Sequence, residues 1–197
     1  METNQKTKPA LTFKQAIGAC ISEYATFTGR SRRSEYWWFA LFSVLMVIIP
    51  LIAMGVVSLV LEGKFMMEPG EVHGALTEAI DSILVIALAL VGLFLFVPSL
   101  AVQTRRLHDT GRSGWWIVGS MIASWAFAVA EFLVLGDVSH GSSIATLQQA
   151  FNVSTACAIV MLMFYLVQAG LTLAIFVFSL FDSQRGENKY GTSPKYQ

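Results

Sequence analysis

Long runs without charge are the feature that most constrains this chain. Residues 36–61 contain no charged side chain, and about 20 apolar residues of helix are enough to cross a hydrocarbon core. Three more apolar runs follow, so the predicted spans are residues 36–61, 80–103, 115–135 and 157–181. Only 13% of the residues are charged, whereas soluble domains have about 25%. We therefore predict an all-α, polytopic membrane protein with four transmembrane helices.

The distribution of basic residues predicts how these spans are oriented. If the four spans alternate in direction, then the N-terminal segment, the loop at 104–114 and the C-terminal segment share one side. Of the 13 lysines and arginines, only Lys64 falls on the other side. Cytoplasmic loops carry the excess of Lys and Arg, so both termini are predicted to be cytoplasmic. Four tryptophans also fall at the cytoplasmic ends of spans, where indoles are enriched: Trp37, Trp38, Trp115 and Trp116.

The segment before the first span has the pattern of an amphipathic helix over residues 12–27. Its apolar residues recur at steps of three and four, and Thr12 is a suitable N-cap. Such a helix can lie in the membrane interface or pack against the rest of the protein, since both need one apolar face. The predicted organisation is a flexible polar tail at 1–10, a single membrane domain at 11–181 and a cytoplasmic tail at 182–197.

Two short motifs at the cytoplasmic ends of spans contain arginine and no lysine. A requirement for charge alone would accept lysine, so we infer that the geometry of the guanidinium group matters. Guanidinium groups bind carboxylates and phosphates in a bidentate manner. One hypothesis is therefore a site for anionic lipid headgroups or phosphate, formed by Arg30, Arg33, Arg105, Arg106 and Arg112. The other, which we favour, is internal pairing that involves Glu35, His108 and Asp109.

The sequence argues against a catalytic or metal-binding role for His108 and Asp109. His108 and Asp109 are adjacent, so their side chains point in different directions and one cannot easily orient the other. A zinc site needs about three or four protein ligands, and His108 is the only histidine on the predicted cytoplasmic side. We therefore expect no catalytic residue, no metal and no cofactor.

One acidic residue lies inside a predicted span. Glu131 is 16 residues beyond Trp115, which is about 24 Å of helix. If the third and fourth spans are neighbours, the same depth on the fourth span is reached at Tyr165, with Gln168 one turn away. We predict that Glu131 faces one of these two side chains. Ionisable residues inside a membrane are functional candidates.

Three separated motifs are similar to those of a known family. They are residues 27–38 (FTGRSRRSEYWW), residues 105–116 (RRLHDTGRSGWW) and residues 186–194 (GENKYGTSP). In this combination and order the chain resembles the bacterial inner-membrane domain-of-unknown-function family 805, from about Phe13 onward. The resemblance implies a small polytopic protein of the bacterial inner membrane. It implies no activity, substrate, cofactor or catalytic residue.

The function favoured by the sequence is a non-enzymatic integral membrane protein. Its cytoplasmic layer of Arg and Trp is expected to pack the bundle and to contact anionic membrane lipids or a partner. The first alternative is a small transporter or channel subunit that acts as a homo-oligomer. The second is an enzyme that acts on lipid through His108 and Asp109. The net charge is zero, so no nucleic-acid partner is expected.

Overall fold

The structure, a computed structural model, describes residues 7–67, 71–138 and 144–196. Side chains are described in this part of the chain except at residues 58, 61–67, 71–77, 131–138 and 144–158. The described residues form helices and no strand, which confirms the all-α prediction. The helices are α1 (Phe13–Ser22), α2 (Arg33–Met67), α3 (Glu71–Asp109), α4 (Trp115–Val138) and α5 (Ile144–Leu180).

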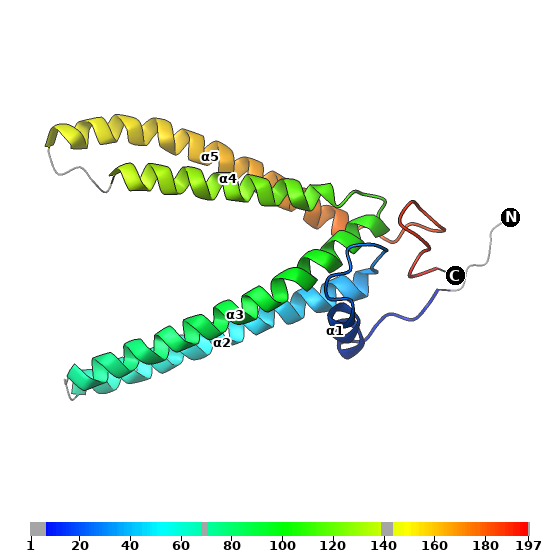
Figure 1. The fold of residues 1–197 in the computed structure, drawn as a ribbon, viewed down its shortest axis with the longest axis horizontal. Helices are drawn as coiled ribbons and strands as arrows, with labels where there is room; N and C mark the ends of the chain where they lie inside the picture. The colour runs from blue at the N-terminus through cyan, green and yellow to red at the C-terminus, as the bar shows by residue number, and fades with distance from the viewer. Residues whose placement is uncertain (1–6, 68–70, 139–143, 197) are drawn as a thin grey trace.

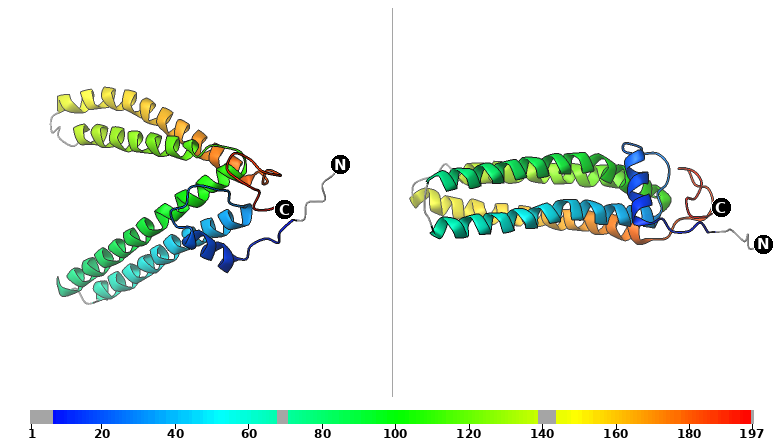
Figure 2. Two further views of the ribbon diagram at one scale, coloured as in Figure 1. Left: turned by 45° about the vertical axis from the view of Figure 1, so that its right-hand side comes forward. Right: turned by 90° about the horizontal axis from the view of Figure 1, so that it is seen from below.

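The long helices form two hairpins that meet at one end and diverge toward the other (Figure 1). α2 lies beside α3, and α4 lies beside α5, in every view (Figure 2). Helix α1, residues 7–12 and residues 182–196 all lie at the end where the hairpins meet. We call this region the motif end. It contains residues 29–38, 105–116 and 182–196.

Three segments of the described chain are long and apolar enough to cross a membrane: Arg33–Val57, Glu78–Asp109 and Ile159–Leu180. In α4 the comparable apolar stretch, Trp115–Ala130, is shorter. Large apolar side chains on these helices are exposed, for example Leu59 at 70% and Leu93 at 68%. A soluble protein rarely exposes contiguous apolar surface on this scale. In a membrane protein the same surface is covered by lipid. The architecture is that of a membrane protein with three to four apolar helices. The presence of four transmembrane helices and the cytoplasmic location of the termini stay predictions.

α1 is shorter than the predicted helix over residues 12–27. It begins after Thr12, whose backbone N–H donates to the Gln15 side chain at 3.0 Å. It ends at Ser22, because Glu23 leaves the helical conformation. One face packs against α2 and α3, where Cys20 is fully buried in a cluster with Phe39, Leu95 and Val102. Packing against protein therefore accounts for one face of this helix.

The turn between α3 and α4 joins the two hairpins. Its N–H groups return to the last carbonyls of α3, with Gly111 N donating to His108 O at 3.0 Å and Arg112 N to Leu107 O at 2.8 Å. Gly111 has φ +76°, a conformation that side chains with a Cβ rarely adopt. Gly114 is needed for a different reason. A Cβ there would lie 2.8 Å from Thr104 Cγ2, so glycine permits the close approach of α4 to α3.

Candidate functional site

Asp109, the last residue of α3, is the centre of a buried polar cluster at the motif end. Its side chain is fully buried and accepts hydrogen bonds from Arg30 Nε at 3.0 Å, Arg106 Nη1 at 2.6 Å and Ser183 Oγ at 2.5 Å. We call these four residues the Asp109 cluster. A buried carboxylate without partners is very unfavourable; here Arg106 comes from the same helix, and Arg30 and Ser183 come from two distant parts of the chain. The cluster therefore connects the segment before α2, the end of α3 and the segment after α5.

The two arginines of the cluster also bind backbone carbonyls that have no partner in a helix. Arg106 donates to the carbonyls of Ser179, at 3.2 Å, and Phe181, at the end of α5. Carbonyls at the C-terminal end of a helix lack intrahelical partners and attract cations. Arg30 binds the C-terminal segment in the same way, through the carbonyls of Gln184 at 2.6 Å and Gly186 at 2.8 Å. Each guanidinium group thus reaches acceptors on different sides through its separate nitrogens, whereas a lysine has only one nitrogen to place.

Arg105 forms a second ionic group with carboxylates from α2 and from the end of α1. It pairs with Glu23, and its Nη2 lies 3.2 Å from Glu35 Oε1. The contact between Arg105 and Glu35 lacks hydrogen-bond geometry and is therefore purely electrostatic. Cys20 Sγ lies 3.8 Å from the same Glu35 oxygen. Burial, and secondarily the Glu35 carboxylate, raises the pKa of the Cys20 thiol to about 12. The thiol is therefore protonated and unreactive at neutral pH.

The C-terminal segment is an integral part of the site, a role that the predicted cytoplasmic tail at 182–197 did not include. The Tyr190 ring stacks on His108, with ring centroids 3.7 Å apart and planes within 8°. Asn188 Nδ2 donates to His108 O at 3.0 Å, and Gln184 N donates to Asp109 O at 3.1 Å. The sequence did carry a signal of order here. That signal is its two glycines, Gly186 and Gly191, because glycine adopts positive φ readily, and both have positive φ in the structure.

An ion pair links the two ends of the C-terminal segment. Lys195 Nζ lies 2.5 Å from Asp182 Oδ2, and the Tyr196 hydroxyl donates to the same oxygen at 3.0 Å. The hydrogen bond from Lys195 lowers the pKa of Asp182 to about 2, and the same bond raises the pKa of Lys195. A backbone hydrogen bond joins this segment to the N-terminal segment, with Lys8 N donating to Lys195 O at 3.0 Å. The two ends of the described chain are therefore held together.

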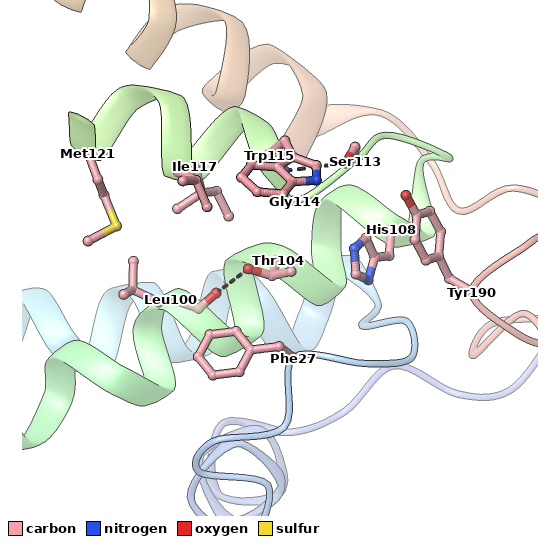
Figure 3. Close-up of a pocket in the computed structure, with 11 residues that line it drawn as sticks. Phe27, Leu100, Thr104, His108, Ser113, Gly114, Trp115, Ile117, Met121 and Tyr190 are labelled. Carbon is pink, nitrogen blue, oxygen red and sulfur yellow. Dashed lines mark hydrogen bonds between the residues drawn. The ribbon is translucent and has the colours of Figure 1, made fainter. Parts of the chain in front are cut away.

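A pocket of about 480 Å³ lies beside the Asp109 cluster, where α3 and α4 begin to diverge (Figure 3). Leu100, from α3, and Ile117 and Met121, from α4, line its apolar part. His108 lies at the end nearest Tyr190. This volume falls in the range of small-molecule sites, which are mostly apolar with a few convergent polar groups.

The remaining candidate residues lie in several places. Arg33 is exposed, and the Arg112 guanidinium lies 4.4 Å from the centroid of the Phe178 ring. Tyr165 contacts Phe127 of α4 at 4.5 Å between centroids, so α4 and α5 are neighbours at this depth. The Gln168 side-chain oxygen is buried without a partner among the described residues. The side chain of Glu131 lies outside the described residues, so its predicted contact stays a prediction.

The described residues contain no group of three His, Cys, Asp or Glu side chains that could hold a metal ion. The fold and the buried cluster define a helical membrane protein whose two hairpins are joined by three sequence motifs. The chain matches a family of proteins of unknown function, DUF805, over residues 24–192 and belongs to that family. The resemblance inferred from the three motifs is thereby confirmed.

Two similar proteins are inner membrane proteins of Escherichia coli strain K12. YhaH is 35% identical over 96 residues, which cover 49% of this chain and 64% of YhaH. YhaI is 31% identical over 100 residues, which cover 49% of this chain and 62% of YhaI. The matched part thus spans less than two thirds of these curated relatives. No solved structure matches the chain. The chain is an inner membrane protein of a family to which no activity is assigned.

Proposed function

We propose that this protein is a non-enzymatic lipid-binding protein of the inner membrane. The observation that carries the proposal is the pocket of about 480 Å³ between α3 and α4. Its apolar wall belongs to helices whose outer surfaces are suited to lipid, so a ligand can enter from the hydrocarbon without crossing water. The Asp109 cluster holds the two hairpins together on one side of this pocket and thereby fixes its width.

The proposal gives different roles to the arginines of the two motifs. Arg30, Arg105 and Arg106 are structural, because their guanidinium groups bind carboxylates and carbonyls of the protein itself. Contact with anionic headgroups is assigned to Arg33 and Arg112, which are exposed. Basic side chains next to a membrane helix attract the anionic cytoplasmic leaflet. The motif end is therefore proposed to face the cytoplasm.

Native mass spectrometry of the purified protein, after exchange into a lipid-free detergent, tests for a retained lipid. Met121→Trp fills the pocket, because Met121 lines it. Ile122→Trp is the matched control, because the neighbouring Ile122 is 64% exposed and is not part of the pocket lining. We expect the unaltered protein and Ile122→Trp to retain one lipid per chain, and Met121→Trp to retain at least about tenfold less.

Two results would contradict this proposal. One is an unaltered protein that keeps no lipid at any detergent concentration at which it stays folded. The other is equal retention by Met121→Trp and Ile122→Trp, which would assign the lipid to the outer surface of the helices.

A further inference from the structure

The polar end of the pocket has a defined hydrogen-bonding pattern, and His108 sets it. His108 is 9% exposed, and its Nδ1 lies 3.2 Å from Gly29 O. A carbonyl oxygen can only accept, so Nδ1 carries the hydrogen and Nε2 of the neutral ring is an acceptor. Nε2 has no hydrogen-bond partner among the described residues. It lies toward the pocket wall, since a Cβ on Gly114 would be 3.5 Å from it.

Two hydroxyl groups complete this end of the pocket. Thr104 Oγ1 donates its hydrogen to Leu100 O at 2.8 Å, so it can offer a ligand only its lone pairs. Ser113 Oγ accepts from Trp115 N at 3.3 Å, so its hydrogen remains available for donation. The residues that line the pocket therefore include two acceptors, His108 Nε2 and Thr104 Oγ1, and one hydroxyl with an unused hydrogen, that of Ser113.

The lining of the pocket is uncharged. None of its residues is Lys, Arg, Asp or Glu. The nearby charges of the Asp109 cluster are already paired with one another and with backbone carbonyls. Lys189 is a nearby cation, with its Nζ 4.9 Å from the centroid of the Tyr190 ring, but it is not part of the lining. A phosphate, carboxylate or ammonium group would thus enter an apolar pocket whose lining offers no counter-charge, which is unfavourable. A neutral hydroxyl group can donate its one hydrogen to His108 Nε2 or to Thr104 Oγ1 and can accept a hydrogen bond from Ser113.

We propose that the ligand is a neutral amphiphile with a hydroxyl head, of the class of long-chain alcohols and acylglycerols. Its hydroxyl donates to His108 Nε2 or Thr104 Oγ1 and accepts from Ser113, and its chain lies along Ile117 and Met121. The stacked Tyr190 ring and the hydrogen bond to Gly29 fix the imidazole in the orientation that this contact needs. This inference rests on the proposed lipid-binding function and adds the chemical class of the ligand.

Photolabelling of the full-length protein in detergent micelles tests the class of head. Three probes share one diazirine-bearing alkyl chain and differ only in the head: a primary alcohol, its phosphate monoester and the corresponding amine. The readout is label on the α4 peptide that contains Ile117 and Met121, relative to label on α2. We expect the alcohol to label this peptide at least about tenfold more than either charged probe.

Variants separate hydrogen bonding from shape. His108→Phe keeps an aromatic ring against Tyr190 but has no acceptor, and it should reduce alcohol labelling to the level of the phosphate probe. Ser113→Ala removes only the hydroxyl and should weaken alcohol labelling several-fold, which keeps the test valid if His108→Phe fails to fold. Ser120→Ala is the matched control, because Ser120 donates to Ile117 O at 2.8 Å and does not line the pocket. It should label like the unaltered protein.

The outcomes distinguish the two proposals. Equal labelling by all three heads, unaffected by Ser113→Ala, overturns the hydroxyl assignment and leaves lipid binding intact. Stronger labelling by the phosphate probe does the same and identifies an anionic lipid instead. No labelling of the α4 peptide above that of α2 by any probe, together with no retained lipid in native mass spectrometry, overturns the lipid-binding function itself.

Discussion

The motif end and the outer parts of the hairpins are built by opposite means. At the motif end, charged side chains such as Arg106 and Asp109 are fully buried and extensively hydrogen-bonded. Along the hairpins, apolar side chains such as Leu59 and Leu93 are exposed. Within a membrane there is no hydrophobic force between helices, because lipid chains are as apolar as leucine. The two hairpins therefore meet where polar contacts join them and diverge where only apolar surface remains.

This difference also indicates where a substitution is costly. A buried charge whose partner is removed is left uncompensated, whereas an exposed charge regains water. The arginines of the two motifs look equivalent in the sequence but fall into these two groups. Stability measurements on single variants can test this division. The following predictions run from the largest expected effect to the smallest.

Replacing Asp109 by asparagine should have the largest effect on stability. The change leaves Arg30 and Arg106 buried without their carboxylate, and breaking a buried ion pair in this way costs about 3–5 kcal/mol. The measurement is unfolding by SDS titration in mixed micelles, followed by tryptophan fluorescence. Asp182→Asn is the matched control, because the Asp182 side chain is 47% exposed. Similar losses in both variants would contradict the division between buried and exposed charges.

Alkylation of Cys20 should be about a thousand-fold slower than that of an ordinary thiol. Its pKa is raised from 9.0 to about 12, so the reactive thiolate is rarer by that factor at neutral pH. The measurement uses a Cys157→Ser background and a water-soluble maleimide. The control carries Cys20→Ser together with Ser22→Cys, which places a thiol at an exposed position of the same helix. Equal rates would show that Cys20 is accessible and ionised.

Replacing Arg106 by lysine keeps the charge and tests the geometry. A lysine at this position cannot contact the Asp109 carboxylate and the carbonyls of Ser179 and Phe181 at the same time. The expected loss is about 1.5–3 kcal/mol, the usual value for a hydrogen bond to a charged group. Arg33→Lys is the control, and its exposed position predicts a change within about 0.5 kcal/mol. If Arg106→Lys is as stable as the unaltered protein, charge alone is sufficient at this position.

The Asp182–Lys195 pair should contribute least, and its contribution should depend on pH. The folded state lowers the pKa of Asp182 from 3.8 to about 2, so the carboxylate stabilises the fold above about pH 4. This contribution is lost as the pH falls from about 4 to about 2, and partial exposure limits it to less than about 1 kcal/mol. The check is the difference in melting temperature between the unaltered protein and Asp182→Asn at pH 6 and pH 2.5. A difference that does not shrink at the lower pH contradicts it.

The sequence predicted the helical architecture because that information is local. Uncharged runs such as 36–61 and 82–104 are long enough to cross a membrane, and a membrane requires internally bonded backbone. The three motifs were also sufficient to predict the family, now confirmed. The end of α1 at Ser22 was not predicted, because apolar spacing continues past the point where the backbone leaves the helix.

The partners of the buried arginines were decided only by the tertiary structure. The absence of lysine in the two motifs suggested the hypothesis that arginine geometry matters, but it left carboxylate pairing and phosphate binding open, since a guanidinium group fits both. Arg30 and Asp109 are 79 residues apart, and Arg106 and Ser179 are 73 apart, so no local pattern links them. The ordered C-terminal segment and the pocket beside His108 also arise only when the two hairpins meet. Hydrophobicity and helix length are properties of a segment, whereas a binding site is a property of segments brought together.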